Sequence, residues 1–362
     1  MKTPLKKASI LLSLIVMATL SLKCDHKAEP EIIASTEINQ EETDYSIDED
    51  VVLREPVVFI TGNDTSSDNY YTNARNYFEQ RKVEVVNGKY SLEEIINWLN
   101  NNADDLPYGE IHIVNKSNPF KGLTLETVVN GEPVTKENLI EINNEGKLPT
   151  LEDAITSNSK IIFHANGLGN NKELMNTLKS TFSANNSPKV VASAYYSIFN
   201  GEFSNHFLAK PYHVFYPTAN SPGKVDLSKE IAKKYPNEKD INWHEAIYNE
   251  TERFVGEAYY TQQNVPVKFE LDYHNSDDEI PTFEIQEEIM DFIEQRTELY
   301  TEFQKLNIPL EKFRWSYKLK NSVLTIKGKS TVITILKPLI KPYGELQHIE
   351  PDTNNKRLYA MK

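Results

Sequence analysis

Short apolar runs alternate with helical patterns between residues 57 and 215, and this alternation allows few architectures. The runs are Val57–Ile60, Val83–Val86, Ile111–Val114, Ile161–His164, Val190–Ala194 and Tyr212–Phe215. Stretches with apolar residues at helical spacing separate several of them, around residues 70–78, 92–99 and 174–182. Strands joined by helices of this length lie parallel in one sheet, with helices on both faces. We therefore predict an α/β fold built on a mostly parallel sheet.

Local signals support the predicted helices and turns. Ser91 and Glu94 have the spacing of a capping box, which predicts a helix beginning at Leu92. An insert, residues 118–157, separates the third and fourth strands. Asn130-Gly131 within it predicts a hairpin, and helical turns are expected to begin at Thr135 and Thr150.

The C-terminal part has a different pattern. Residues 265–273 are expected to form a strand and residues 282–306 one amphipathic helix. Two further strands are predicted, Phe313–Lys320 and Val323–Leu336, the second interrupted at Gly328. We predict a core at residues 56–220 and a C-terminal α+β portion, residues 221–362, packed on it.

The N-terminus predicts export and lipid attachment. Lys6 and Lys7 precede an apolar stretch that ends at Lys23-Cys24. This is the pattern of a signal peptide, here residues 1–23, and the stretch is shorter than the roughly 20 apolar residues of a membrane span. We expect lipid on Cys24 and a bacterial lipoprotein held in the cell envelope, on the outer membrane or the cell surface. An unprocessed anchor and simple secretion are the alternatives, because Lys23 stands where such cleavage sites have a small residue.

The charge of the exported chain restricts its partners. The sequence holds 39 basic and 53 acidic residues, and residues 1–23 contain four lysines and no acids, so the remainder has a formal charge of −18. Residues 24–55 are acidic and poor in apolar side chains, which predicts a flexible tether. Such an acidic protein is not expected to bind nucleic acid, nor to be held on anionic lipid by charge. Cys24 is the only cysteine, so no thiol remains for catalysis once it carries lipid. No metal site and no cofactor are predicted.

Candidate site residues follow two neighbouring strands of the predicted sheet. Working residues of an open parallel sheet lie just past the carboxyl ends of its strands. Strand 110–114 leads into Asn115-Lys116-Ser117-Asn118-Pro119, and strand 160–163 leads into His164-Ala165-Asn166-Gly167-Leu168-Gly169. These two segments are the first place to look for function.

The same two segments carry a resemblance to caspase-like cysteine peptidases, the group that includes gingipains and legumains. The shared frame is His112-Ile-Val114, Asn118-Pro119, His164 and Leu168-Gly169, within residues 57–215, and Val323–Leu339 is similar to the tail of bacterial members. The resemblance implies a caspase-like fold. It also places Lys116 where the family has its catalytic histidine, and Asn166 where it has its nucleophilic cysteine.

Both replacements remove peptidase chemistry. Asparagine is no substitute for a thiolate nucleophile, and a solvated lysine stays protonated near neutral pH. We therefore expect a non-catalytic protein that binds a peptide or protein in the former substrate groove, lined by Lys116, Ser117, His164, Asn166 and Tyr195.

Three other interpretations remain open at this stage. Lys116 and Asn166 could form a structural hydrogen-bonded pair. A hydrolase could use a remodelled site, with Ser117 or a bound water attacking and His164 assisting. A structural envelope lipoprotein would have an insert 118–157 that blocks the strand ends.

Overall fold

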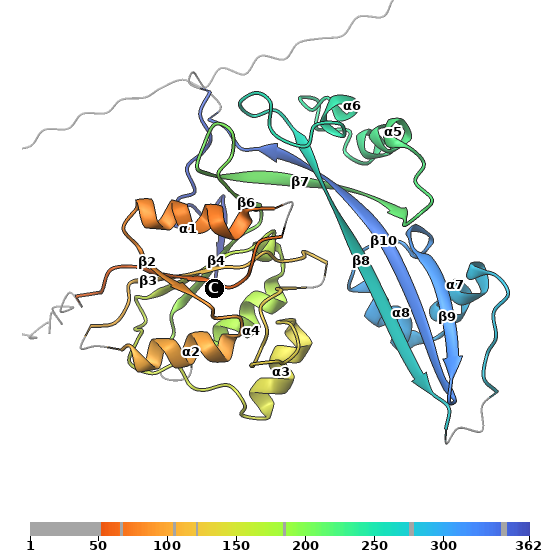
Figure 1. Ribbon diagram of the computed structural model, residues 1–362, viewed down its shortest axis with the longest axis horizontal. Helices are drawn as coiled ribbons and strands as arrows, with labels where there is room; N and C mark the ends of the chain where they lie inside the picture. The colour runs from red at the N-terminus through yellow and green to blue at the C-terminus, as the bar shows by residue number, and fades with distance from the viewer. Residues whose placement is uncertain are drawn as a thin grey trace, which may run out of the picture. The chain divides into compact units, whose positions relative to one another are not determined.

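The computed structural model describes residues 52–65, 68–103, 106–120, 122–183, 186–274, 279–341 and 346–362 (Figure 1). These residues belong to one compact unit, Val51–Lys362. The predicted signal peptide, the lipidation site Cys24 and most of the predicted tether lie outside the described residues.

The first sheet has six strands, and five of them run parallel. Its order is β11-β5-β4-β3-β1-β2, and only the edge strand β11 runs antiparallel to its neighbour. The strands are β1 (Val57–Ile60), β2 (Glu84–Asn87), β3 (Glu110–Val114), β4 (Lys160–His164), β5 (Lys189–Ser193) and β11 (Tyr359–Met361). The prediction of an α/β fold with a mostly parallel sheet is confirmed.

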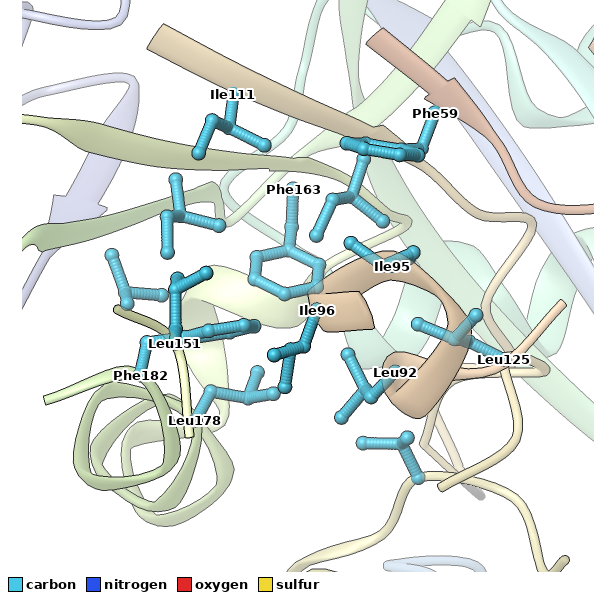
Figure 2. Close-up of a cluster of buried hydrophobic side chains, with 14 of the residues drawn as sticks. Phe59, Leu92, Ile95, Ile96, Ile111, Leu125, Leu151, Phe163, Leu178 and Phe182 are labelled. Carbon is cyan, nitrogen blue, oxygen red and sulfur yellow. The ribbon is translucent and has the colours of Figure 1, made fainter. Parts of the chain in front are cut away.

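Helices cover both faces of this sheet. They are α1 (Tyr70–Gln80), α2 (Leu92–Asn101), α3 (Lys136–Asn144) and α4 (Lys172–Phe182), with a 3₁₀ turn at Leu168–Asn170. Figure 2 shows the core on the face that α2 and α4 cover, where Phe59, Ile111 and Phe163 from the strands meet Ile96 and Leu178 from the helices. On the other face, Val58 and Ile60 of β1 pack against Phe78 of α1. Alternate strand residues thus supply two cores, as the two-residue period of a strand requires.

The capping box predicted at Ser91 is present. The Ser91 hydroxyl accepts a hydrogen bond from the Glu94 backbone N–H at 3.2 Å, and the Glu94 carboxylate accepts one from the Ser91 N–H at 3.1 Å. Two amides of the first helical turn are therefore satisfied inside the protein, where Ser91 is fully buried.

The second sheet is antiparallel and is organised around one long strand. Its order is β6-β7-β10-β8, and β9 pairs with β10 as well. The strands are β6 (Tyr196–Phe199), β7 (His206–Pro217), β8 (Tyr259–Asp272), β9 (Arg314–Lys320) and β10 (Val323–Pro338). The second half of β10 pairs with β7 and the first half with β9, while β8 pairs along most of its length.

Two pairs of helices pack on the second sheet. α7 (Gln286–Gln295) and α8 (Thr297–Gln304) contribute to one apolar cluster with Val265, Leu324 and Ile326 (Figure 1). α5 (Lys224–Lys234) and α6 (Trp243–Ala246) contribute to another with Ile333 and Ile335. A second 3₁₀ turn, Leu310–Lys312, precedes β9. Because consecutive β10 residues face opposite sides, one strand supplies both clusters.

Several element predictions differ from the structure. The run Tyr212–Phe215 lies in β7 of the antiparallel sheet and does not close the parallel one. The single helix predicted at residues 282–306 is two helices, because Arg296 has an extended backbone with φ −100° and ψ 104°. β10 runs through Gly328 without interruption, and a Cβ there would lie 2.6 Å from the Trp315 ring. Thr150 precedes an isolated turn and no helix.

The two sheets do not follow the predicted division at residue 220. β7 precedes it and belongs to the second sheet, whereas β11 follows it and belongs to the first. The assignment of residues 56–220 and 221–362 to separate portions stays a prediction. Among the helices that the structure describes, none is both long and apolar enough to cross a membrane.

Replacing Ser91 by alanine should lower the free energy of unfolding by about 1 kcal/mol, because it removes the hydroxyl that caps α2. Urea denaturation measures this. Ser180→Ala, an exposed serine within α4, is the matched control and should change stability by less than about 0.5 kcal/mol. Equal effects of the two substitutions would contradict the role given to the capping box.

Candidate functional site

The order of the parallel strands identifies one position where a ligand can be held. From β1 the chain moves to β2 on one side, then crosses back to β3 on the other side of β1. The connections leaving the carboxyl ends of β1 and β3 therefore diverge. Ligands of open α/β sheets bind at such a switch point.

A pocket of about 420 Å³ lies at this switch point. Its volume is within the range of small-ligand sites, roughly 300–1,000 Å³. Its walls come from the loop after β1, from α1, from the loop between β2 and α2, from the loop after β3 and from the insert. The lining residues are Thr61, Gly62, Asn63, Tyr71, Tyr90, Lys116, Thr124 and Glu126. Every one of these except Gly62 carries a polar side-chain group.

Two carboxylates from the loop after β1 bind the backbone amides at the N-terminus of α1. Asp64 accepts hydrogen bonds from the Tyr71 N–H at 2.8 Å and the Thr72 N–H at 2.9 Å, and Asp68 accepts one from the Tyr70 N–H at 3.1 Å. Burial raises the pKa of Asp64, but the hydrogen bonds from Thr72 and Tyr71 outweigh it and hold the pKa below its ordinary value. The positive end of the helix dipole, where a ligand phosphate would bind, is thus already neutralised.

Among the residues that line the pocket, Lys116 is the only one with a cationic side chain. Its backbone N–H donates to the Tyr71 hydroxyl at 2.9 Å, and its ammonium contacts the carboxylate of Asp68. Partial burial lowers the pKa of Lys116, and the charge of Asp64 opposes that shift. About half of the Lys116 side chain is exposed.

Asn115 holds the walls of the pocket together. It is fully buried, and its amide donates to the Thr61 hydroxyl at 2.9 Å while its carbonyl accepts from the Thr124 N–H at 2.9 Å. The Thr61 hydroxyl in turn donates to the Val114 carbonyl at 2.8 Å. One side chain therefore fixes the loop after β1, the end of β3 and the insert relative to one another. Gly62 lets Tyr71 approach, because a Cβ there would lie 2.2 Å from its ring.

Ser117 and Asn166 meet at the neighbouring strand end. The Ser117 hydroxyl donates to the backbone carbonyl of Asn166 at 3.2 Å. The Asn166 side-chain oxygen is buried and has no hydrogen-bond partner among the described residues. Lys116 and Asn166 share no hydrogen bond in the described part of the chain, since Lys116 is engaged by Asp68.

His164 lies inside the protein, on the face of the sheet that α1 covers. The Nε2 atom of His164 and the Nδ1 atom of His112 lie 2.9 Å apart and form a hydrogen bond. The His164 ring packs edge-on against Phe78, with the ring centroids 5.4 Å apart. His206 stacks nearby on Phe199 and bonds the Ser197 hydroxyl at 2.8 Å. Burial lowers the pKa of His164 well below its ordinary value and that of His206 to about 3. Both rings are therefore neutral at physiological pH.

The five residues predicted to line the groove occupy three environments. Lys116 faces the pocket, and Ser117 and Asn166 contact each other beside it. His164 belongs to the buried histidine cluster, and Tyr195 packs beside Ile162 and Leu208. The alternation Ile162-Phe163-His164 already places His164 on the same face as buried Ile162. The sequence analysis placed Asn115 in the segment after strand 110–114 without giving it a role, and it did not single out Tyr71, Tyr90 or Thr124. The parity of strand residues was the available signal for His164, and no sequence signal marked those three.

Among the residues that the structure describes, no group of three or more histidine, cysteine or acidic side chains is arranged to hold a metal ion. Comparisons of the chain with models of protein families, with curated proteins and with solved structures found no match.

The histidine cluster predicts a loss of stability in mild acid. Well above pH 6.5 the rings of His164 and His206 are neutral in both the native and the unfolded state, so they do not make stability depend on pH. Below pH 6.5 these two histidines become protonated in the unfolded chain but stay neutral in the native state, because their native pKa values are lowered. The free energy of unfolding should fall from pH 6.5 downward, by at most about 1.4 kcal/mol per pH unit for each histidine.

His206→Phe should reduce this slope between pH 6.5 and pH 5, measured by urea denaturation at several pH values. This pH range lies above the range in which carboxylates titrate, so they do not contribute to the slope. Glu110 is one example, because hydrogen bonds from His112 and Lys160 lower the pKa of its carboxyl to about 2. His244→Gln changes an exposed histidine and is the control. An unchanged slope in His206→Phe would contradict the account of the cluster.

Proposed function

We propose that this chain is a non-catalytic binding protein that holds a short peptide segment in the pocket between β1 and β3. The observation that carries the proposal is the pocket itself, an open pocket of about 420 Å³ at the switch point of the sheet. The insert supplies Thr124 and Glu126 to its wall and leaves the cavity in place. This favours a binding role over a purely structural one.

The charges around the pocket disfavour a nucleotide. Nucleotide-binding sheets hold phosphate on the amides of the helix that follows the first strand. Here Asp64 and Asp68 already bind the first amides of α1, so an incoming phosphate would meet two carboxylates. The ammonium of Lys116 is paired with Asp68 and does not compensate both.

The lining groups suit the backbone of a peptide. A peptide presents N–H donors and carbonyl acceptors in alternation, and a site that binds it needs partners of both kinds. Lys116 supplies a donor, Glu126 an acceptor, and the hydroxyls of Tyr71, Tyr90 and Thr124 can act as either. Tyr90 is 41% exposed, and its ring offers apolar surface for a ligand side chain.

The caspase-like resemblance is part of this proposal. Its basis is the two sequence segments, which follow the paired neighbouring strands β3 and β4. Hydrolysis by a remodelled site receives little support. The Ser117 hydroxyl is bonded to a backbone carbonyl, and His164 is turned toward His112, so no described contact joins a nucleophile to a base.

Lipid attachment at Cys24 and residence in the bacterial cell envelope complete the proposal. Their support is the sequence of residues 6–24 alone. Membrane attachment by lipid would hold the pocket near a surface while the tether separates the two.

The peptide proposal is tested by incubating the protein with a complex peptide library and identifying retained peptides by mass spectrometry. We expect peptides to be retained. Lys116→Gln should weaken their binding about tenfold, because it removes a charge-assisted hydrogen bond. Lys172→Gln, an exposed lysine at the start of α4, is the control and should leave binding unchanged.

Two outcomes would contradict the proposal. Cleavage of library peptides that disappears in Ser117→Ala or His164→Ala would identify an enzyme with a rebuilt site. Retention of no peptide at all would favour the structural role.

Lipid attachment is tested separately by growing the host expressing the full chain with labelled palmitate. Label should enter the protein and disappear in Cys24→Ser, since no other cysteine exists. Label that persists in Cys24→Ser, or none in the unmodified chain, would contradict lipidation at this residue.

A further inference from the structure

The exposed face of the second sheet gathers basic side chains, although the protein as a whole is acidic. In the half of the sheet where β9 pairs with β10, alternate residues point toward α7 and α8 or toward solvent. Trp315, Leu324, Ile326 and Phe269 are on the buried side. The exposed basic residues on the other side are Lys268, Arg314, Lys318, Lys320, Lys327 and Lys329, and we call them the basic face. Two acids, Glu270 and Asp272, share this side.

The strand register places like charges directly opposite each other. Lys327 is paired with Lys268 on β8, and Lys329 is paired with Arg314 on β9. Like charges at directly opposed positions destabilise a sheet. A protein with more acids than bases has many ways to avoid both pairs, so their presence points to a use for the positive charge.

Most of the basic face is not neutralised by the protein. Lys268 forms an ion pair with Glu270 at 2.8 Å. In the described part of the chain, none of the other five basic residues forms an ion pair. Lys327 also lies near Glu270, whose pKa is lowered first by the hydrogen bond from Lys268 and further by the charges of Lys268 and Lys327. The exposed side chains of Arg314, Lys318, Lys320 and Lys329 keep their charges available to a partner.

We propose that the basic face docks an acidic, extended segment of a partner protein. Lys318 and Lys320, and likewise Lys327 and Lys329, are two residues apart along their strands, which is a spacing of about 6.6 Å. Alternate carboxylates of an extended peptide repeat at the same interval. An acidic strand lying over the sheet can thus match each ammonium with a carboxylate.

The surroundings favour a short acidic peptide over larger polyanions. Single-stranded nucleic acid needs aromatic rings to stack on, and Phe269, Trp315 and Tyr317 all face the helices instead. The formal charge of the whole chain is −14, which repels a long polyanion or a charged membrane. A short segment meets only the local field, because charges beyond about 8 Å are screened at physiological salt.

The test uses fluorescence anisotropy with the full chain and a labelled peptide of alternating Glu and Thr. We expect binding that weakens as salt is added. The double variant Lys327→Gln/Lys329→Gln should bind about tenfold more weakly. Lys172→Gln/Lys189→Gln removes two exposed lysines elsewhere and should bind like the unmodified protein. The first variant should be at least as stable to urea as the unmodified protein, because it removes two repulsive pairs.

Other results would overturn the inference. Absence of peptide binding would do so, and so would equal affinities for the two double variants. Tighter binding of polyuridine RNA or of phosphatidylglycerol vesicles than of the peptide would assign the basic face to a different partner. Binding to the pocket between β1 and β3 should not change in Lys327→Gln/Lys329→Gln, so this inference and the proposed function can fail separately.

Discussion

Asn115 uses both ends of its buried amide to connect the end of β3 with a loop 54 residues earlier and with the insert nine residues later. The Thr61 hydroxyl and the Thr124 amide are its partners, from the loop after β1 and from the insert. A buried amide left without these bonds would cost roughly 1–3 kcal/mol, so the three segments are fixed together. The position of Lys116, one residue later, follows from this arrangement. The geometry of the pocket thus depends on a side chain that does not line it.

The second constraint is electrostatic and decides which ligands suit the pocket. Asp64 and Asp68 satisfy the amides at the start of α1 and neutralise the positive end of the helix. Sheets with this strand order can bind a phosphate at the start of the helix that follows the first strand. Asp64 and Asp68 occupy that position here, so the pocket suits ligands that carry no phosphate. The pairing of Asp68 with Lys116 also leaves the pocket without a strong net cation.

The local parts of the fold were predictable from the sequence. The capping box at Ser91 and the apolar runs of β1, β3 and β4 each depend on residues close together in the chain, and the structure contains them. The pairing of β10 with β7 joins residues more than a hundred positions apart, and its pairing with β8 joins residues more than fifty apart, so no short pattern encodes either. Only β9 and β10 are neighbours in the chain. The sequence around the break between α7 and α8 at Arg296 contains no glycine or proline that would predict it. It arises where both α7 and α8 pack on one apolar cluster.

The candidate site was predictable at the level of strand ends but not of partners. Lys116 was identified from its place after β3, and it does line the pocket. Its partner Asp68 comes from a loop 48 residues earlier in the chain, which only the folded structure brings near. His164 was placed in the groove because it follows an apolar run. The structure counts it as the last residue of β4, on the side that α1 covers.

Hydrogen–deuterium exchange of the protein with and without a retained library peptide is the most direct test of the central claim. The account predicts slower exchange in residues 61–63 and 115–126, which contain the lining residues Thr61, Lys116 and Thr124, and little change elsewhere. Protection confined to other segments, with these two unchanged, would contradict a ligand site between β1 and β3.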